Sequence, residues 1–128
     1  MPRMLTPDQI DHFNSQGFLV IDDVLDTATL DAVKAEYSDL LDRLYAGWQA
    51  LGLVPDGTGL DFWQKLLTSY KAGCDWFQPM DISLPGGDIA ADTPFHFGPA
   101  VFDMLTNPRL LDMVEDLIGA ELTSNPIQ

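Results

Sequence analysis

The chain is short of basic residues, and this shortage excludes two classes of partner. Its 128 residues hold 6 lysines and arginines against 20 aspartates and glutamates, which gives a net charge of −14. A field of this sign repels phosphate backbones and anionic lipid surfaces. We therefore expect neither a nucleic acid nor a membrane as a partner, and an anionic substrate gains no attraction from this chain.

Cysteine occurs only once, as Cys74, so the chain cannot form an intramolecular disulfide. This is typical of a protein in the reducing cytoplasm. The N-terminal stretch MPRMLTPDQ lacks the apolar segment of a secretory signal. No apolar run approaches the roughly 18 residues needed to span a membrane. We therefore expect a cytoplasmic protein.

Histidine is also scarce, and the two that are present limit the possible metal chemistry. A non-haem iron site built from two histidines and one carboxylate needs a His-x-Asp motif and a distant histidine. His12 is followed by Phe13-Asn14 and His96 by Phe97-Gly98, so neither begins that motif. The sequence therefore predicts no catalytic, cofactor-binding or metal-binding residue in this chain.

Apolar residues make up 46% of the chain, enough for a globular core, and their spacing is mostly helical. Thr6-Pro7-Asp8-Gln9 has the pattern of a helix start with a capping box, and Asn107-Pro108 has that of a second start. Between Leu30 and Trp48, apolar residues recur at steps of three and four. The predicted helices cover residues 7–16, 27–51, 61–70, 99–105 and 108–118.

Two segments favour β-strands instead. Residues 18–24 begin with an apolar run rich in strand formers, bounded by Gly17 and by Asp22-Asp23. Residues 121–128, after the last predicted helix, read as the start of a second strand. The predicted fold class is therefore α+β and mostly helical. Residues 71–98 are rich in proline, glycine and aromatics and are expected to be irregular.

Three residues are candidates for lining a substrate pocket. His96 lies between aromatics and prolines in TPFHFGP, and Asn125 and Gln128 lie on the expected terminal strand. An amide that faces inward from such a strand contacts a ligand or a buried water. The alternatives are a half-buried histidine bonded to backbone and an ordinary strand end.

The segments LTPDQIDHFNSQGFLVIDDVLD and FHFGPAVFDMLTNPRLLDMVEDLIG, the second followed by SNPIQ, resemble the N-terminal region of the phytanoyl-CoA dioxygenase family. This resemblance implies a double-stranded β-helix, or jelly-roll, core. It also implies Fe(II) held by His-x-Asp and a distal histidine, with 2-oxoglutarate anchored by a later arginine. Such enzymes hydroxylate a C–H bond of a small-molecule substrate. Arg3, Arg43 and Arg109, the arginines of this chain, do not match the cosubstrate arginine.

The resemblance leads to a specific expectation for residues 1–128. They form the N-terminal helical part of one oxygenase domain, truncated before the iron-binding strands. Fe(II) and 2-oxoglutarate belong to the full-length parent, and the chain alone binds no cofactor and is inactive. The alternatives are a small non-catalytic helical interaction protein and one half of a split oxygenase. For the truncated oxygenase part, apolar helix faces left uncovered would cause self-association, whereas a complete interaction protein would be monodisperse.

Overall fold

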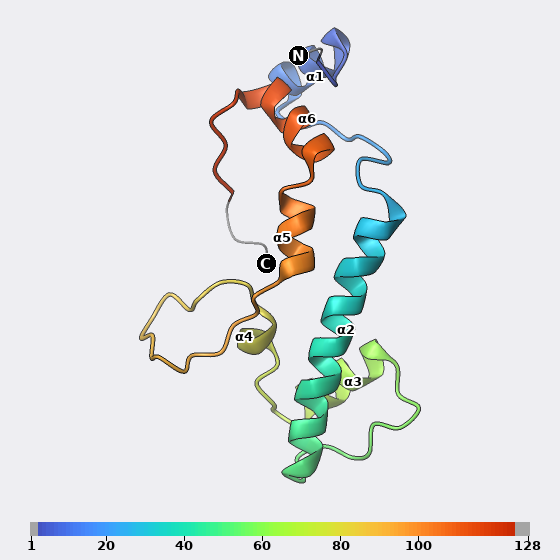
Figure 1. The fold of residues 1–128 in the computed structure, drawn as a ribbon, viewed down its shortest axis with the longest axis vertical. Coiled ribbons are helices and arrows are strands. Elements are labelled where there is room, and N and C mark those ends of the chain that lie inside the picture. Colours follow the sequence, from blue (N-terminus) through green and yellow to red (C-terminus); the bar gives the residue numbers. More distant parts are fainter. Residues whose placement is uncertain (1–2, 125–128) are drawn as a thin grey trace. The chain divides into compact units, whose positions relative to one another are not determined.

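The computed structural model describes residues 3–124, and every regular element in that range is a helix (Figure 1). The elements are α1 (Pro7–Gln16), α2 (Thr27–Ala50), α3 (Phe62–Lys71), α4 (Phe77–Met80), α5 (Pro99–Leu105) and α6 (Pro108–Ile118). They form two compact units, one of residues 3–33 and 99–124 and the other of residues 34–98. No helix among the described residues is long and apolar enough to cross a membrane.

The predicted strands are wrong where the structure can be compared with them. Residues 18–24 and 121–124 form no strand, and residues 125–128 lie outside the described part of the chain. Asp23 has a φ of 56°, in the left-handed region, and this interrupts the extended run. Phe18 and Val20 are 56% and 77% exposed, so the run buries neither of them against a neighbour. The α+β class with a jelly-roll portion is therefore replaced by an all-helical architecture over residues 3–124.

In the first unit, local capping sets the ends of α1 as predicted. The Thr6 hydroxyl accepts the backbone N–H of Gln9 at 3.2 Å, and the Gln9 side chain accepts the Thr6 N–H at 2.9 Å. This reciprocal pair satisfies donors that the first turn leaves without helical partners. Gly17 ends the helix with a φ of 81°, a conformation that glycine adopts without steric cost.

Helix α6 has the expected boundaries as well, and α1 packs against it. The Asn107 side chain accepts the Leu110 N–H at 3.2 Å at its start. A carboxylate oxygen of Asp116 accepts two backbone N–H groups from the segment before α1, that of Met4 at 2.6 Å and that of Leu5 at 2.9 Å. Leu5 is 4% exposed. One side chain of α6 therefore fixes the entry to α1.

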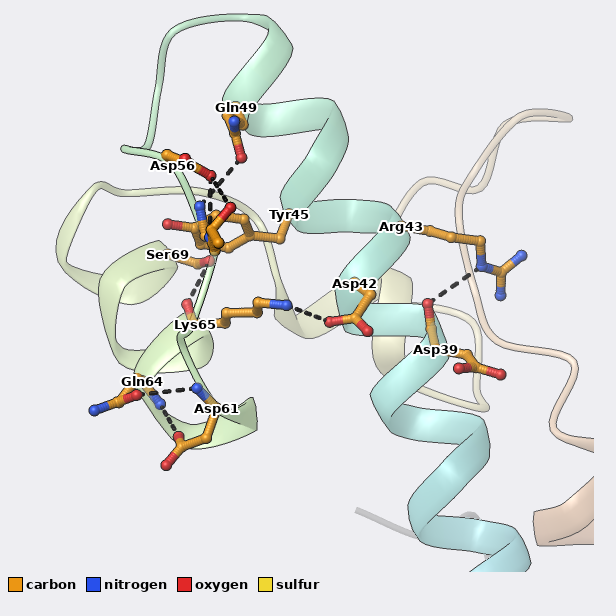
Figure 2. Close-up of polar contacts among 12 residues, drawn as sticks. Asp39, Asp42, Arg43, Tyr45, Gln49, Asp56, Asp61, Gln64, Lys65 and Ser69 are labelled. Atoms are coloured by element: carbon orange, nitrogen blue, oxygen red, sulfur yellow. Dashed lines mark hydrogen bonds and ion pairs between the residues drawn. The ribbon is translucent and has the colours of Figure 1, made fainter.

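In the second unit, the core forms where α2, the loop after it and α3 meet. Its buried residues are Leu41, Tyr45, Val54 and Ser69. α3 begins with a capping box in which the Asp61 side chain accepts the Gln64 N–H at 2.8 Å and the Gln64 side chain accepts the Asp61 N–H at 2.9 Å (Figure 2). This pair fixes the direction in which α3 leaves the loop.

The predicted irregular region is irregular apart from α4, and its second half is a closed loop. The His96 backbone N–H donates to the Asp81 carbonyl at 2.7 Å, which joins the two ends of residues 81–96. The Gln78 side-chain amide donates to the carbonyls of Ser83 and Pro94, at 3.0 and 3.1 Å. We call residues 81–96 the 81–96 loop. Its backbone is tied to itself at both ends, as in compact loops of this length.

Candidate functional site

A surface pocket of about 320 Å³ lies between the second half of α2, the following loop and α3. Its lining residues are Asp42, Tyr45, Ala46, Gln49, Asp56, Gly57, Thr58, Gly59, Leu60 and Lys65. Figure 2 shows the Tyr45 side chain reaching from α2 toward the loop, with Lys65 directed toward Asp42. The pocket therefore belongs to the core of the second unit and to its polar margin.

The polar groups of this pocket bond to one another. Lys65 Nζ lies 2.6 Å from Asp42 Oδ1, and Gln49 Oε1 accepts the Gly57 N–H at 3.3 Å. Asp56 Oδ1 accepts the backbone N–H and the hydroxyl of Thr58. These two bonds, the backbone one first, lower the pKa of the Asp56 carboxyl below its usual value of 3.8. The hydrogen bonds among the lining residues therefore stabilise the conformation of the loop after α2.

This pocket has little of what catalysis requires. The two lining hydroxyls, those of Tyr45 and Thr58, donate to the Pro55 carbonyl and to the Asp56 carboxylate that caps the same turn. The one lining cation, Lys65, is engaged by Asp42. The charged groups of the pocket are therefore engaged in contacts within the fold.

A second polar cluster lies deeper in the same unit, around His96. Its Nε2 atom lies 3.1 Å from Oε2 of Glu36, and the two side chains are 9% and 13% exposed. The distance suits an ion pair, but the two atoms are not aligned as a hydrogen bond. The Tyr37 ring lies beside the imidazole, with the two ring centroids 5.2 Å apart.

The pKa of Tyr37 indicates the electrostatic character of this cluster. Burial, as the main cause, raises the pKa of its hydroxyl above 10.0, and the negative charges of Glu36 and Asp81 raise it further. The surroundings of His96 on the α2 side and at the end of α4 are therefore negative.

The predicted pocket residues fall in different places. His96 is buried in the cluster just described and is not among the lining residues of the 320 Å³ pocket. Asn125 and Gln128 lie outside the described residues, so their pocket role stays a prediction. His12 is exposed on α1, edge-on to the Phe18 ring at 5.2 Å. Cys74 is a half-buried free thiol.

The residues described do not fit an iron centre. Between residues 3 and 124, no three His, Cys, Asp or Glu side chains are grouped so that they could hold a metal ion. His12 and His96 belong to different units. Of the arginines considered for a cosubstrate, Arg43 donates through Nε to the Asp39 carbonyl at 3.4 Å, one turn earlier in α2.

The two charge pairs of the second unit were not predicted from the sequence. Asp42 and Lys65 are 23 residues apart, and Glu36 and His96 are 60 apart, so no helical spacing relates either pair. Glu36 lies among other charged residues of α2, such as Lys34 and Asp39, so its charge alone did not single it out. Comparison of the chain with models of protein families, with curated proteins and with solved structures found no match.

Proposed function

We propose that this chain is the helical N-terminal part of a phytanoyl-CoA dioxygenase-like hydroxylase, located in the cytoplasm. The parent enzyme would use Fe(II) and 2-oxoglutarate to hydroxylate a small-molecule substrate. The proposal rests on the sequence resemblance of two segments, residues 5–26 and the segment that begins at Phe95.

One observation supports this proposal most directly. α1 and α6, which carry much of the resemblance, are far apart in sequence and pack together in one unit. The Asp116 carboxylate of α6 accepts the N–H groups of Met4 and Leu5, which precede α1 and lie 112 and 111 residues earlier in the chain. Two scaffold motifs that form one packed unit behave as a single structural element. Such an element supports a neighbouring catalytic part without supplying its reacting groups.

Under this proposal, the iron ligands and the 2-oxoglutarate arginine lie outside this chain. The described residues contribute binding surface and shape, and bound Fe(II) with 2-oxoglutarate would supply the oxidising chemistry. The 81–96 loop, with its exposed Leu84 and Ile89 at 45% and 56%, is the part of this chain assigned to the substrate side.

The source gene tests the proposal directly. We expect the reading frame beyond the Gln128 codon to encode His-x-Asp, a distal histidine and an arginine. A complementary measurement is Fe(II) titration of the 128-residue chain under anaerobic conditions. Stoichiometric, tight Fe(II) binding by this chain alone would contradict the assignment of the ligands to residues outside it.

The exposed apolar face of α3 favours a second candidate function, a non-catalytic interaction protein. Trp63, Leu67 and Tyr70 are 72%, 52% and 65% exposed. Their spacing of four and three residues places them on one face of the helix. Tryptophan and tyrosine are the residues that most often dominate binding at protein interfaces.

Sedimentation and thermal melting of the 128-residue chain separate the two candidates. An interaction protein should be monodisperse and should melt cooperatively. The N-terminal part of a larger enzyme should instead self-associate through its uncovered apolar faces as its concentration rises. One half of a split oxygenase would be recognised by co-purification with a second chain that carries His-x-Asp.

A further inference from the structure

The 81–96 loop contacts α2 through a charged pair, Glu36 and His96. The loop closes on itself through the 2.7 Å bond from the His96 N–H to the Asp81 carbonyl. The imidazole of the same residue then extends to Glu36 on α2, with 3.1 Å between Nε2 and Oε2. His96 therefore both closes the loop and attaches it to the helix.

A hydrogen on Nε2 of His96 favours this contact. Without hydrogen on Nε2, the imidazole would place a lone pair against a carboxylate oxygen at 3.1 Å, in a site shielded from water. A neutral imidazole can supply that hydrogen, but only in one of its two tautomers. A protonated imidazole donates from both nitrogens and adds a positive charge beside the carboxylate.

We propose that the Glu36–His96 pair is a pH-dependent latch, which holds the 81–96 loop against α2 when His96 is protonated and loosens it when His96 is neutral. The inference does not depend on the proposed enzymatic function, because it concerns a contact within this chain. The test covers roughly pH 5 to 8, because histidine is the side chain type whose charge most often changes in this interval.

The groups around His96 favour this direction. Glu36 faces the imidazole from α2, and Asp81 contributes negative charge from the end of α4. Tyr37, also on α2, stays neutral through this range, because burial and both carboxylates raise the pKa of its hydroxyl above 10.0. The attraction therefore acts on the imidazolium from two elements.

Loosening the latch would also change the surface that the loop presents. Phe95 and Phe97 flank His96, and their ring centroids are 4.4 Å apart. Phe97 is already 78% exposed. Release of His96 frees the backbone between these rings, so the aromatic pair moves with the loop end.

Hydrogen exchange of the loop amides tests the proposal, with opening constants corrected for the intrinsic effect of pH. The most informative amide is that of His96, because its N–H donates to the Asp81 carbonyl and is thereby protected from exchange. We expect its opening constant to rise about tenfold more from pH 5 to pH 8 in the wild-type chain than in His96→Gln. Glu36→Gln, which keeps the shape of the side chain, should remove most of the same pH dependence.

His12→Gln is the matched control, because it removes the other histidine and lies on α1 in the other unit. It should retain the wild-type pH response. The glutamine variants at positions 12 and 96 keep the formal net charge of −14, so a general effect of the acidic chain would appear equally in both. Added salt should weaken such a general effect more than a pair that is about nine-tenths buried.

Two results would overturn the latch. One is the same pH response in the wild-type chain and Glu36→Gln. The other is a loop that opens on acidification, which would mean that the cost of burying the imidazolium exceeds its attraction to Glu36. If His96→Gln does not fold, the comparison of wild type with Glu36→Gln still decides between these outcomes.

Discussion

Gly57 lies directly against the ring of Tyr45, the buried tyrosine of α2. A β-carbon at Gly57 would come within 2.7 Å of Tyr45 Cε1 and 3.0 Å of Cδ1. The ring cannot easily yield, because Tyr45 is 2% exposed and its hydroxyl donates to the Pro55 carbonyl at 2.8 Å. The loop after α2 therefore approaches the helix at a distance that only glycine permits.

Gly57→Ala should accordingly destabilise the second unit, by about 1–3 kcal/mol, the usual cost of forcing extra volume into a packed core. Chemical denaturation followed by circular dichroism measures this change. Gly47→Ala is the control, since a β-carbon there meets no atom within 4 Å. In the helix interior that substitution should stabilise by about 0.5–1 kcal/mol. Equal stability of the two variants would contradict the close approach at Gly57.

Removing the Asp116 carboxylate should detach the segment before α1. Asp116→Ala leaves the Met4 and Leu5 amides without their acceptor, and a hydrogen bond to a charged group contributes about 1.5–3 kcal/mol. The expected result is faster hydrogen exchange at these two amides and a lower free energy of unfolding of the first unit. Glu115→Ala, which removes the neighbouring exposed carboxylate, should leave both unchanged.

We predict that the folded chain loses stability at alkaline pH because of Tyr37. Its hydroxyl has a raised pKa in the folded chain, so the folded state holds the proton more tightly than the unfolded state does. This contribution is complete below pH 10.0 and is lost as the pH rises through the folded value. Tyr37→Phe should remove that alkaline dependence. Ultraviolet absorbance of tyrosinate in the two chains locates the titration, and an identical alkaline transition in both would refute the assignment.

The apolar face of α3 should control association of the chain. Trp63→Glu places a charge within the exposed Trp63–Leu67–Tyr70 face and should lower the association constant by at least about tenfold, the effect of losing one central interface residue. Sedimentation velocity over a concentration series measures this change. Asn14→Glu adds the same charge on α1 and should not alter association. A wild-type chain that remains monomeric at all concentrations would exclude self-association through this face.

The helix boundaries could be predicted because each depends on a few neighbouring residues. Thr6 with Gln9, and Asn107 with Pro108, form their caps within one turn, and a local pattern is sufficient to recognise them. A strand depends on a partner elsewhere, which is why the run beginning at Phe18 was misassigned.

Burial and the charge pairs were harder to predict for a related reason. Helical periodicity indicates an apolar face but not whether another element covers it. Trp63 has the apolar character expected of a core residue and is 72% exposed, whereas Tyr45, which carries a polar hydroxyl, is 2% exposed. The contact of Glu36 with His96 depends on how the chain returns after 60 residues, and no spacing rule specifies that path.

The closed ends of the 81–96 loop make it a site where the chain can change length. Its two ends are held together by the bond between His96 and Asp81, so the distance between them does not depend on what lies in between. Lengthening such a loop costs little, about 0.6 kcal/mol for each doubling. Gly86 and Gly87 are exposed, and a β-carbon at either would meet open space. A peptide tag or a recognition sequence inserted between these two glycines would therefore leave the helices in place, and natural variants could diversify here at low cost.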